Sequence, residues 1–314
     1  MTVRSVPPAL SSEALFGKSK VYIRRGLAAK DRGDHDEYQL WSSLALELIA
    51  KSALAAIHPC LIADPNSHVS LFGAAGHPIG TDIKTIAAHT VFDRVAHLTK
   101  DFDKSIEAFC RDFSLKRNAE LHSGEAPFEA STGGSWEGRF WHAAEIILAV
   151  KGETIETWLG ADGSKAPQKI IDHYRAVMRE AALSRVEISR KRFLERKPKE
   201  QKAAHEAAAK LSNYAMYQAF DLVADEIWQT KCPACGGSAF LAGIEFGEEV
   251  TGDVDPDFPD EEWVDKYHTA EEFICTSCNL HLESRSDIEA VELDPDYTKS
   301  EIRRREYEAE YGND

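Results

Sequence analysis

The chain has 314 residues, of which 43% are hydrophobic, and its formal net charge is −16. This length favours two modest domains, and the apolar residues are grouped at helical spacing, which excludes a disordered acidic protein. The negative charge lies at one end, because residues 240–314 hold 23 acidic and 6 basic residues while residues 1–239 sum to +1. The N-terminal part is therefore free to present a basic site.

Apolar residues recur at helical spacing through the first half of the chain, with Gly and Pro between the groups. Residues 60–80 contain Pro, Asn and three Gly, so we expect a loop there. Thr81 and Asp101 are the expected N-caps of the two helices that follow this loop. The spacing predicts five helices, at residues 19–33, 36–57, 81–99, 102–123 and 135–159.

The most apolar stretch, residues 44–63, contains residues that do not suit a membrane span, namely Glu47, Lys51, His58 and Pro59. Glu47 and Lys51 are one helical turn apart and can pair. A buried helix of a soluble protein explains this stretch better than a membrane span. Residues 1–20 lack the apolar region of a secretory leader, so we expect a cytoplasmic protein with no membrane partner.

Residues 165–229 are rich in Ala, Glu, Lys and Arg, and beyond Pro167 at their start the one strong helix breaker is Pro198. They predict long helices that are split or kinked at this proline, and we place a helical arm at residues 161–229. A basic run in the arm, residues 185–202, includes Arg190, Lys191 and Arg192. Such a run is either a solvated helix face or a contact for an RNA backbone.

Helical spacing stops after Thr230, where Gly, Phe and acidic residues become common, so we place a domain boundary there. Four of the six cysteines form two Cys-x-x-Cys pairs, which are Cys232, Cys235, Cys275 and Cys278. Two such turns supply four thiolates for a tetrahedral site, and Gly236 and Gly237 let the first turn close into a strand. The pattern resembles a zinc ribbon at residues 230–293, whose long acidic linker we interpret as an inserted loop.

A zinc ion at these cysteines would be structural, because four thiolates leave no open coordination position. The alternative is a redox-active dithiol, but two matched pairs favour metal ligation. His281 is a further candidate ligand that could replace one cysteine. The acidic surroundings argue against phosphate contact by the ribbon and favour protein binding or oligomerisation.

A second pattern, Arg117-Asn118-x-x-x-His122, lies at the expected end of a helix. RNA cleavage without metal needs a base, an acid and a cation at the phosphate. The imidazole of His122 can transfer protons near neutral pH, and Arg117 offers a charged planar fork to phosphate oxygens. Asn118 lies four residues before His122, on the same helical face. In the alternative interpretation, Arg117 makes a surface salt bridge and His122 complements the helix dipole.

Residues 36–160 resemble the HEPN superfamily of all-α ribonucleases and RNA-binding proteins. The similarity rests on three segments, which contain Glu47 and Lys51, Gly76 and His77, and Arg117, Asn118 and His122. The resemblance implies a homodimer in which two Arg and two His surround one scissile phosphate. Glu47, Lys51 and His77 are then expected to contact and orient these residues without contacting the RNA themselves. The 2′-OH is the available nucleophile, so the expected product carries a 2′,3′-cyclic phosphate and a 5′-OH.

Members of this family act as toxins, antiphage effectors and RNA-guided nucleases. The resemblance therefore implies a metal-independent endoribonuclease that cuts tRNA or mRNA in bacterial toxicity or defence. A cognate inhibitor or another component of a defence system would be a natural partner. Two other functions stay open: a non-catalytic RNA- or protein-binding adaptor, and a sensor whose zinc ribbon docks a partner.

These observations predict a mainly α fold with a small β-rich part. The expected order is an HEPN-like helical domain at residues 1–160, a helical arm at 161–229, a zinc ribbon with an acidic insert at 230–293 and a C-terminal helix at 294–314. An acidic insert near residues 245–270 could mask a ribonuclease site by mimicking RNA, which is an autoinhibition hypothesis.

Overall fold

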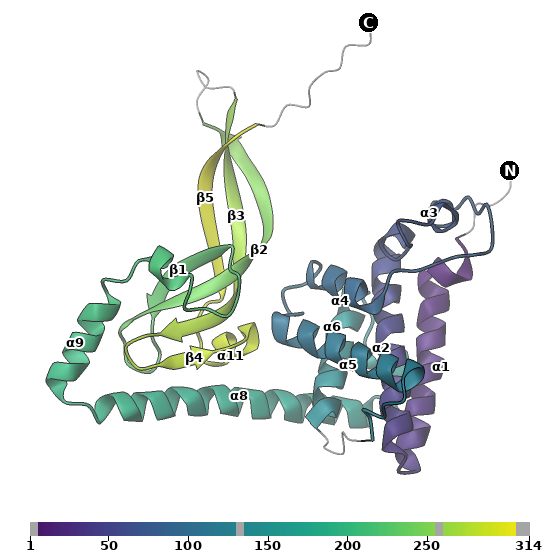
Figure 1. Cartoon of the computed structure of the whole chain (residues 1–314), viewed down its shortest axis with the longest axis horizontal. Helices are drawn as coiled ribbons and strands as arrows, with labels where there is room; N and C mark the ends of the chain where they lie inside the picture. The colour runs from purple at the N-terminus through teal and green to yellow at the C-terminus, as the bar shows by residue number, and fades with distance from the viewer. Residues whose placement is uncertain (1–5, 130–134, 255–259, 306–314) are drawn as a thin grey trace, which may run out of the picture. The chain divides into compact units, whose positions relative to one another are not determined.

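The computed structural model describes residues 6–129, 135–254 and 260–305 (Figure 1). The chain divides into two compact units, Met1–Val177 and Met178–Asp314. The division falls within one long helix, α8 (Lys165–Leu194), whose first part belongs to unit 1 and whose remainder belongs to unit 2.

Unit 1 is built from helices around α2. Its helices are α1 (Ser12–Asp31), α2 (His35–Ile57), α3 (His68–Ala74), α4 (Ala88–Ala96), α5 (Lys104–His122), α6 (Ser135–Val150), α7 (Ile155–Leu159) and the start of α8, with 3-10 turns at Pro8–Leu10 and Pro59–Leu61. Helix α2 packs against α1, α4, α5 and α6. The core contains Trp141 and Trp158, both fully buried, with their ring centroids 6.1 Å apart.

Helix α2 is long and apolar enough to cross a membrane by length and composition alone. However, 61% of its apolar window is buried inside the protein. Such burial is typical of the core helix of a soluble protein, because a helix that is apolar on most sides must cover those sides with neighbours.

Side-chain caps explain where two of the main helices begin. The Asp34 carboxylate accepts a hydrogen bond from the Glu37 amide at the start of α2, and Asp103 does the same for Ile106 at the start of α5. The cap of α5 is therefore Asp103 rather than Asp101.

The helix expected at residues 81–99 begins only at Ala88. The preceding segment is extended, because the Ile86 amide donates to the carbonyl of Ile62 and Thr85 forms a β-bridge with Ala63. The segment expected to be a loop, residues 60–80, contains the short helix α3.

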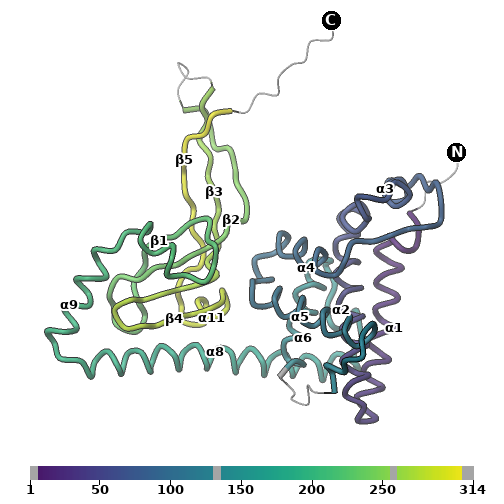
Figure 2. Tube along the Cα trace, viewed as in Figure 1, coloured from purple at the N-terminus to yellow at the C-terminus, as the bar shows by residue number. Residues whose placement is uncertain are grey.

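Unit 2 contains one five-stranded antiparallel sheet (Figures 1 and 2). Its strands are β1 (Glu226–Lys231), β2 (Ser238–Asp253), β3 (Glu261–Cys275), β4 (Leu280–Leu282) and β5 (Asp296–Arg304). The order is β1-β2-β3-β4, and β5 pairs with the other half of β3. The helices of unit 2 are the rest of α8, α9 (Pro198–Ala208), α10 (Asn213–Met216) and α11 (Arg285–Ala290).

The prediction of a mainly α fold with a small β-rich part is wrong. Of the residues that the structure describes, 54% are helical and 18% lie in strands, and these strands form one antiparallel sheet, so the protein is a mixed α and β protein. The supposed acidic insert accounts for the difference, because its residues continue β2 and β3 as a paired hairpin with Val250 opposite Val264.

Cross-strand ion pairs stabilise this extension of the sheet. Arg303 on β5 reaches Glu248 on β2 at 2.7 Å and Glu262 on β3 at 3.0 Å. Val264 on β3, which pairs with Val250 on β2 and Glu301 on β5, is completely buried. The described acidic residues Glu248 and Glu262 thus lie on paired strands and not in an inserted loop, while residues 255–259 of the same segment lie outside the described part.

The prediction of a C-terminal helix at residues 294–314 is also wrong for the described residues, since Asp296–Arg304 is strand β5. Residues 306–314 lie outside the described part. The expected break at Pro198 is confirmed: α8 ends at Leu194, and the proline occupies the first turn of α9.

Candidate functional sites: a four-cysteine centre and the end of helix α5

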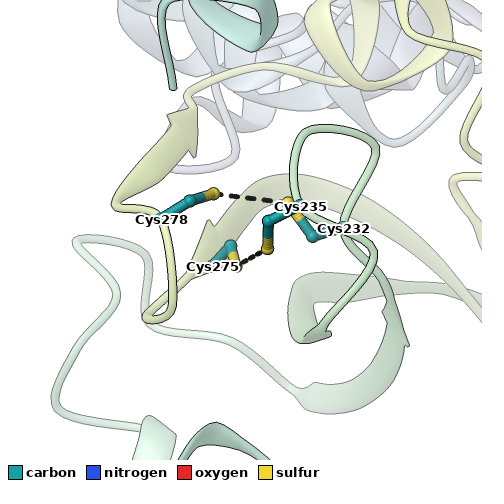
Figure 3. Close-up of side chains that lie close together, drawn as sticks. All are labelled: Cys232, Cys235, Cys275 and Cys278. Carbon is teal, nitrogen blue, oxygen red and sulfur yellow. Dashed lines mark hydrogen bonds between the residues drawn. The ribbon is translucent and has the colours of Figure 1, made fainter. Parts of the chain in front are cut away.

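The four cysteines of the two pairs converge in unit 2 (Figure 3). The sulfur atoms of Cys232 and Cys278 are 3.5 Å apart, and those of Cys235 and Cys275 are 3.7 Å apart. Zn–S bonds of about 2.3 Å in a tetrahedron place the sulfurs about 3.8 Å from one another, whereas a disulfide needs about 2.05 Å. The separations therefore fit a shared metal ion such as zinc, and all four cysteines are free of disulfides.

The two turns have the same backbone design. The residue after the second cysteine of each pair has a positive φ, +74° at Gly236 and +58° at Asn279, and glycine and asparagine tolerate this conformation best. In the first turn, the Ala234 amide lies 3.4 Å from the sulfur of Cys232 and donates to it. In the second turn, the Cys278 amide donates to Cys275, so each turn points an amide inward at a sulfur.

Hydrogen bonds within the cluster divide the four thiols: they raise the pKa of Cys232 and Cys278 and lower the pKa of the other two. Hydrogen bonds from Cys232, Cys275 and Cys278 lower the pKa of the Cys235 thiol. The pKa of Cys275 is lowered to about 7, mainly by its hydrogen bond with Cys232. Thiolates are the form that binds metal, so the donor set matches a soft or borderline cation.

The Arg-Asn-x-x-x-His motif occupies the last two turns of α5. Arg117 is buried, 9% exposed, and its Nη1 donates to Oε2 of Glu47 at 2.6 Å. The other oxygen of Glu47 pairs with Lys51 at 2.7 Å, and Lys51 donates to Thr85 at 2.9 Å. Burial raises the pKa of Glu47, but the two cations outweigh it and lower the pKa overall. The structure therefore brings Arg117, Glu47 and Lys51 into one buried cluster.

Asn118 and His122 lie on the exposed side of the same helix. Leu115 and Leu121 are on this side too, 65% and 48% exposed. Within the described part of the chain, no hydrogen bond or ion pair links His122 to Arg117, Glu47 or Lys51. The Nε atom of Arg117 is buried without a hydrogen-bond partner. One chain thus presents the imidazole and the guanidinium separately.

His77 is not part of this arrangement. It is exposed in the segment after α3, and its ring centroid lies 6.2 Å from that of Phe72. Among the described residues, no hydrogen bond or ion pair joins it to Arg117, Glu47 or Lys51.

The basic run on α8 does not form one free cationic surface. Arg190 donates to the carbonyls of Pro233 at 2.8 Å and Ala234 at 3.3 Å, and it pairs with Glu187 at 2.8 Å. Lys191 and Arg192 are exposed. The structure thus assigns Arg190 to the first cysteine turn, so of these three residues only Lys191 and Arg192 are accessible.

Two features of the structure had no signal in the sequence. Asp221, Glu272 and His281 approach one another, with the His281 Nε2 atom 2.6 Å from Oε1 of Glu272. Asp221 lies 51 residues before Glu272 and 60 before His281, so no local motif marks the group. His281 therefore pairs with Glu272, outside the cysteine cluster.

Unit 1 also has a cavity of about 1280 Å³ between α6, α7 and the start of α8, with Ile146, Val150 and Lys169 among its lining residues. No motif marks these residues, because they come from helices that fold together only in the tertiary structure.

A scan against protein-family models found no match to this chain, and searches of curated proteins and of solved structures found none either.

Proposed function

We propose that the protein is a metal-independent endoribonuclease of the HEPN type that acts as a homodimer, with Arg117, Asn118 and His122 in its active site. The observation that carries the proposal is the buried Arg117–Glu47–Lys51 cluster beneath the exposed end of α5. Two cations share one carboxylate, so the cluster keeps a net positive charge. A preorganised cation at this place suits a phosphate that gains charge in the transition state.

The exposed face of α5 supports the dimer. Leu115 and Leu121 are large apolar side chains that flank Asn118 on this face. Exposed apolar side chains that share a face with candidate site residues favour an interface. A second copy covering this face by twofold symmetry would bring two His122 side chains together.

The two imidazoles then divide the proton transfers. One accepts the proton of the 2′-OH as it attacks phosphorus, and the other protonates the departing 5′-oxygen. Arg117 stabilises the phosphate charge, and Asn118 orients the ring or a phosphate oxygen. The products carry a 2′,3′-cyclic phosphate and a 5′-OH. The substrate class is tRNA or mRNA in the cytoplasm, in bacterial toxicity or antiphage defence.

The cysteine centre has a separate role in this proposal. A zinc ion held by four thiolates would complete unit 2 structurally, because no coordination position is left for a substrate. Cys232, Cys235, Cys275 and Cys278 would supply the whole shell, and cleavage would not require a metal.

A second function is favoured by one observation. The Nη1 atom of Arg117 is committed to Glu47 at 2.6 Å, and the side chain is only 10% exposed. In this second function, the arginine stabilises the packing of α5 against α2 and does not contact a phosphate. The chain would then be a non-catalytic adaptor that binds RNA or protein through the same face of α5.

An RNA cleavage assay with single variants separates the two functions. His122→Ala removes an exposed side chain, so the fold is expected to remain intact, and an active-site proton donor of this kind contributes roughly 10²–10⁴-fold to the rate. The matched control is His89→Ala, another exposed histidine of unit 1. Loss of cleavage in the first variant alone supports the ribonuclease; RNA binding without cleavage by the parent protein supports the adaptor.

A further inference from the structure

Two arginines, one on α8 and one just after it, hold the two cysteine turns from outside. Arg190 donates to the carbonyls of Pro233 and Ala234, the two middle residues of the first Cys-x-x-Cys turn. Arg196, just after α8, donates from Nη1 to the carbonyl of Ser277 at 2.6 Å, in the middle of the second turn. Each turn therefore has its own arginine.

Apolar packing joins the same elements. The second half of α8 contributes Ala182, Val186 and Phe193 to the buried cluster that contains Cys232, Cys275 and Cys278. This part of α8 thus shares a core with three of the four metal-ligand candidates, which couples the position of the helix to the position of the sulfurs.

Helix α9 contacts both cysteine turns and the end of α8. The ring of His205 stacks on Phe193, with centroids 4.9 Å apart and planes 18° apart. A Cβ atom at Gly237 would lie 2.6 Å from Cδ2 of His205, and the Ser277 hydroxyl donates to the carbonyl of Ala204. Glycine at 237 is therefore required for α9 to approach the first turn this closely.

The chemistry of the turns explains why cations belong there. The amides point inward at the sulfurs, so the carbonyls of the middle residues point outward and need donors. Four thiolates on a divalent ion leave a net charge of about −2, and two guanidinium groups outside the turns offset it. Groups that hold metal ligands from outside typically change metal affinity by roughly 10–100-fold when they are removed.

We propose that Arg190 and Arg196 are positioning residues of the metal centre, one for each turn, and that metal binding and docking of α9 and the second half of α8 form one coupled equilibrium. A metal ion holds the turns in the geometry that the arginines and His205 recognise. Docking of these two helical segments in turn holds the sulfurs in the geometry that the metal needs. This inference concerns unit 2 alone and does not depend on ribonuclease activity.

The first test measures zinc affinity of the full chain by competition with a chromogenic chelator. Arg190→Ala and Arg196→Ala are each expected to weaken binding by roughly 10–100-fold. Lys191→Ala and Arg192→Ala are the matched controls, because both side chains are exposed on the same helix, and their affinity should stay within about twofold of the parent. Unchanged affinity in both of the first two variants would overturn the proposal.

Conservative variants distinguish positioning from general damage to the fold. Arg196 donates to one carbonyl, so Arg196→Lys should restore most of the affinity that Arg196→Ala loses. Arg190 uses two donors in a fork, which a lysine cannot reproduce, so Arg190→Lys should restore less. Equal behaviour of the two lysine variants would contradict the assigned geometry.

Hydrogen exchange on the unmodified protein tests the coupling without any variant. Removing the metal with a chelator should speed amide exchange in Pro198–Ala208, the α9 helix, as well as in the cysteine turns. Exchange in α5 of unit 1 is the internal reference and should not change. Protection of α9 that is the same with and without metal would overturn the coupled equilibrium.

Discussion

Replacing Glu47 with glutamine tests whether the buried cluster beneath α5 depends on one carboxylate. Glu47→Gln keeps the volume of the side chain but removes its charge, so Lys51 and Arg117 lose their shared counter-charge. These three side chains are only 14%, 11% and 10% exposed. Water therefore cannot replace the carboxylate without opening the packing between α2 and α5.

The size of the effect follows from the distances. Two ion pairs at 2.6 and 2.7 Å each correspond to about 6 kcal/mol of Coulomb attraction at an effective dielectric constant of about 20. Much of this attraction only offsets the cost of burying the charges. Removing one member of a buried ion pair destabilises proteins by about 3–5 kcal/mol, and we expect unit 1 to lose this amount near neutral pH.

Native-state hydrogen exchange is the suitable assay, because it reports the opening free energy of α2 and α5 separately from unit 2. Asp112→Asn is the control, since it breaks the exposed Asp112–Lys116 pair on α5 and should cost less than about 1 kcal/mol. The pKa of Glu47 is lowered on folding, so its stabilisation is present above the usual carboxylate pKa and is lost as the pH falls through the folded value. A Glu47→Gln effect below about 1 kcal/mol at neutral pH would refute the buried-cluster argument.

Three further predictions concern other parts of the chain. Burial and, to a smaller extent, the charge of Arg175 lower the pKa of His142 to about 4. Between pH 6.5 and 4 the unfolded chain therefore binds more protons than the folded chain. Acidification over this range should lower the free energy of unfolding of unit 1 by about 3 kcal/mol. His142→Gln should remove that loss, and an unchanged pH dependence of α6 exchange would contradict it. Leu115→Asp should shift the protein from dimer to monomer in sedimentation, whereas Val21→Asp on α1, also at an exposed position, should not; equal behaviour would argue against the α5 interface. Elemental analysis should find one zinc per chain, and Cys275→Ser should abolish it; a metal-free protein with native unit 2 exchange would contradict a structural zinc.

Local signals in the sequence predicted the parts of the structure that depend on local chemistry. The paired Cys-x-x-Cys patterns predicted all four members of the cysteine cluster, because the conformation of each turn depends only on its own four residues. Likewise, the one-turn spacing of Glu47 and Lys51 predicted their contact, and Pro198 marked the break between α8 and α9.

Parts that depend on distant partners could not be predicted in this way. The extended hairpin carries charges on both faces, so it lacks the apolar alternation of a half-buried strand, and its segment 296–304 resembled a charged helix. The partners of Lys299 and Arg303 are Glu226 and Glu248, more than fifty residues away. In the same way, the role of Arg190 depends on the carbonyls of a turn that is forty residues further along the chain.

The most direct test of the proposed function is the end chemistry of RNA incubated with the purified protein in excess EDTA. We expect fragments with 2′,3′-cyclic phosphate and 5′-OH ends from the parent protein and from His89→Ala, and none from His122→Ala. Fragments with 3′-OH ends, cleavage that EDTA abolishes, or cleavage that persists in His122→Ala would contradict the ribonuclease site at the end of α5.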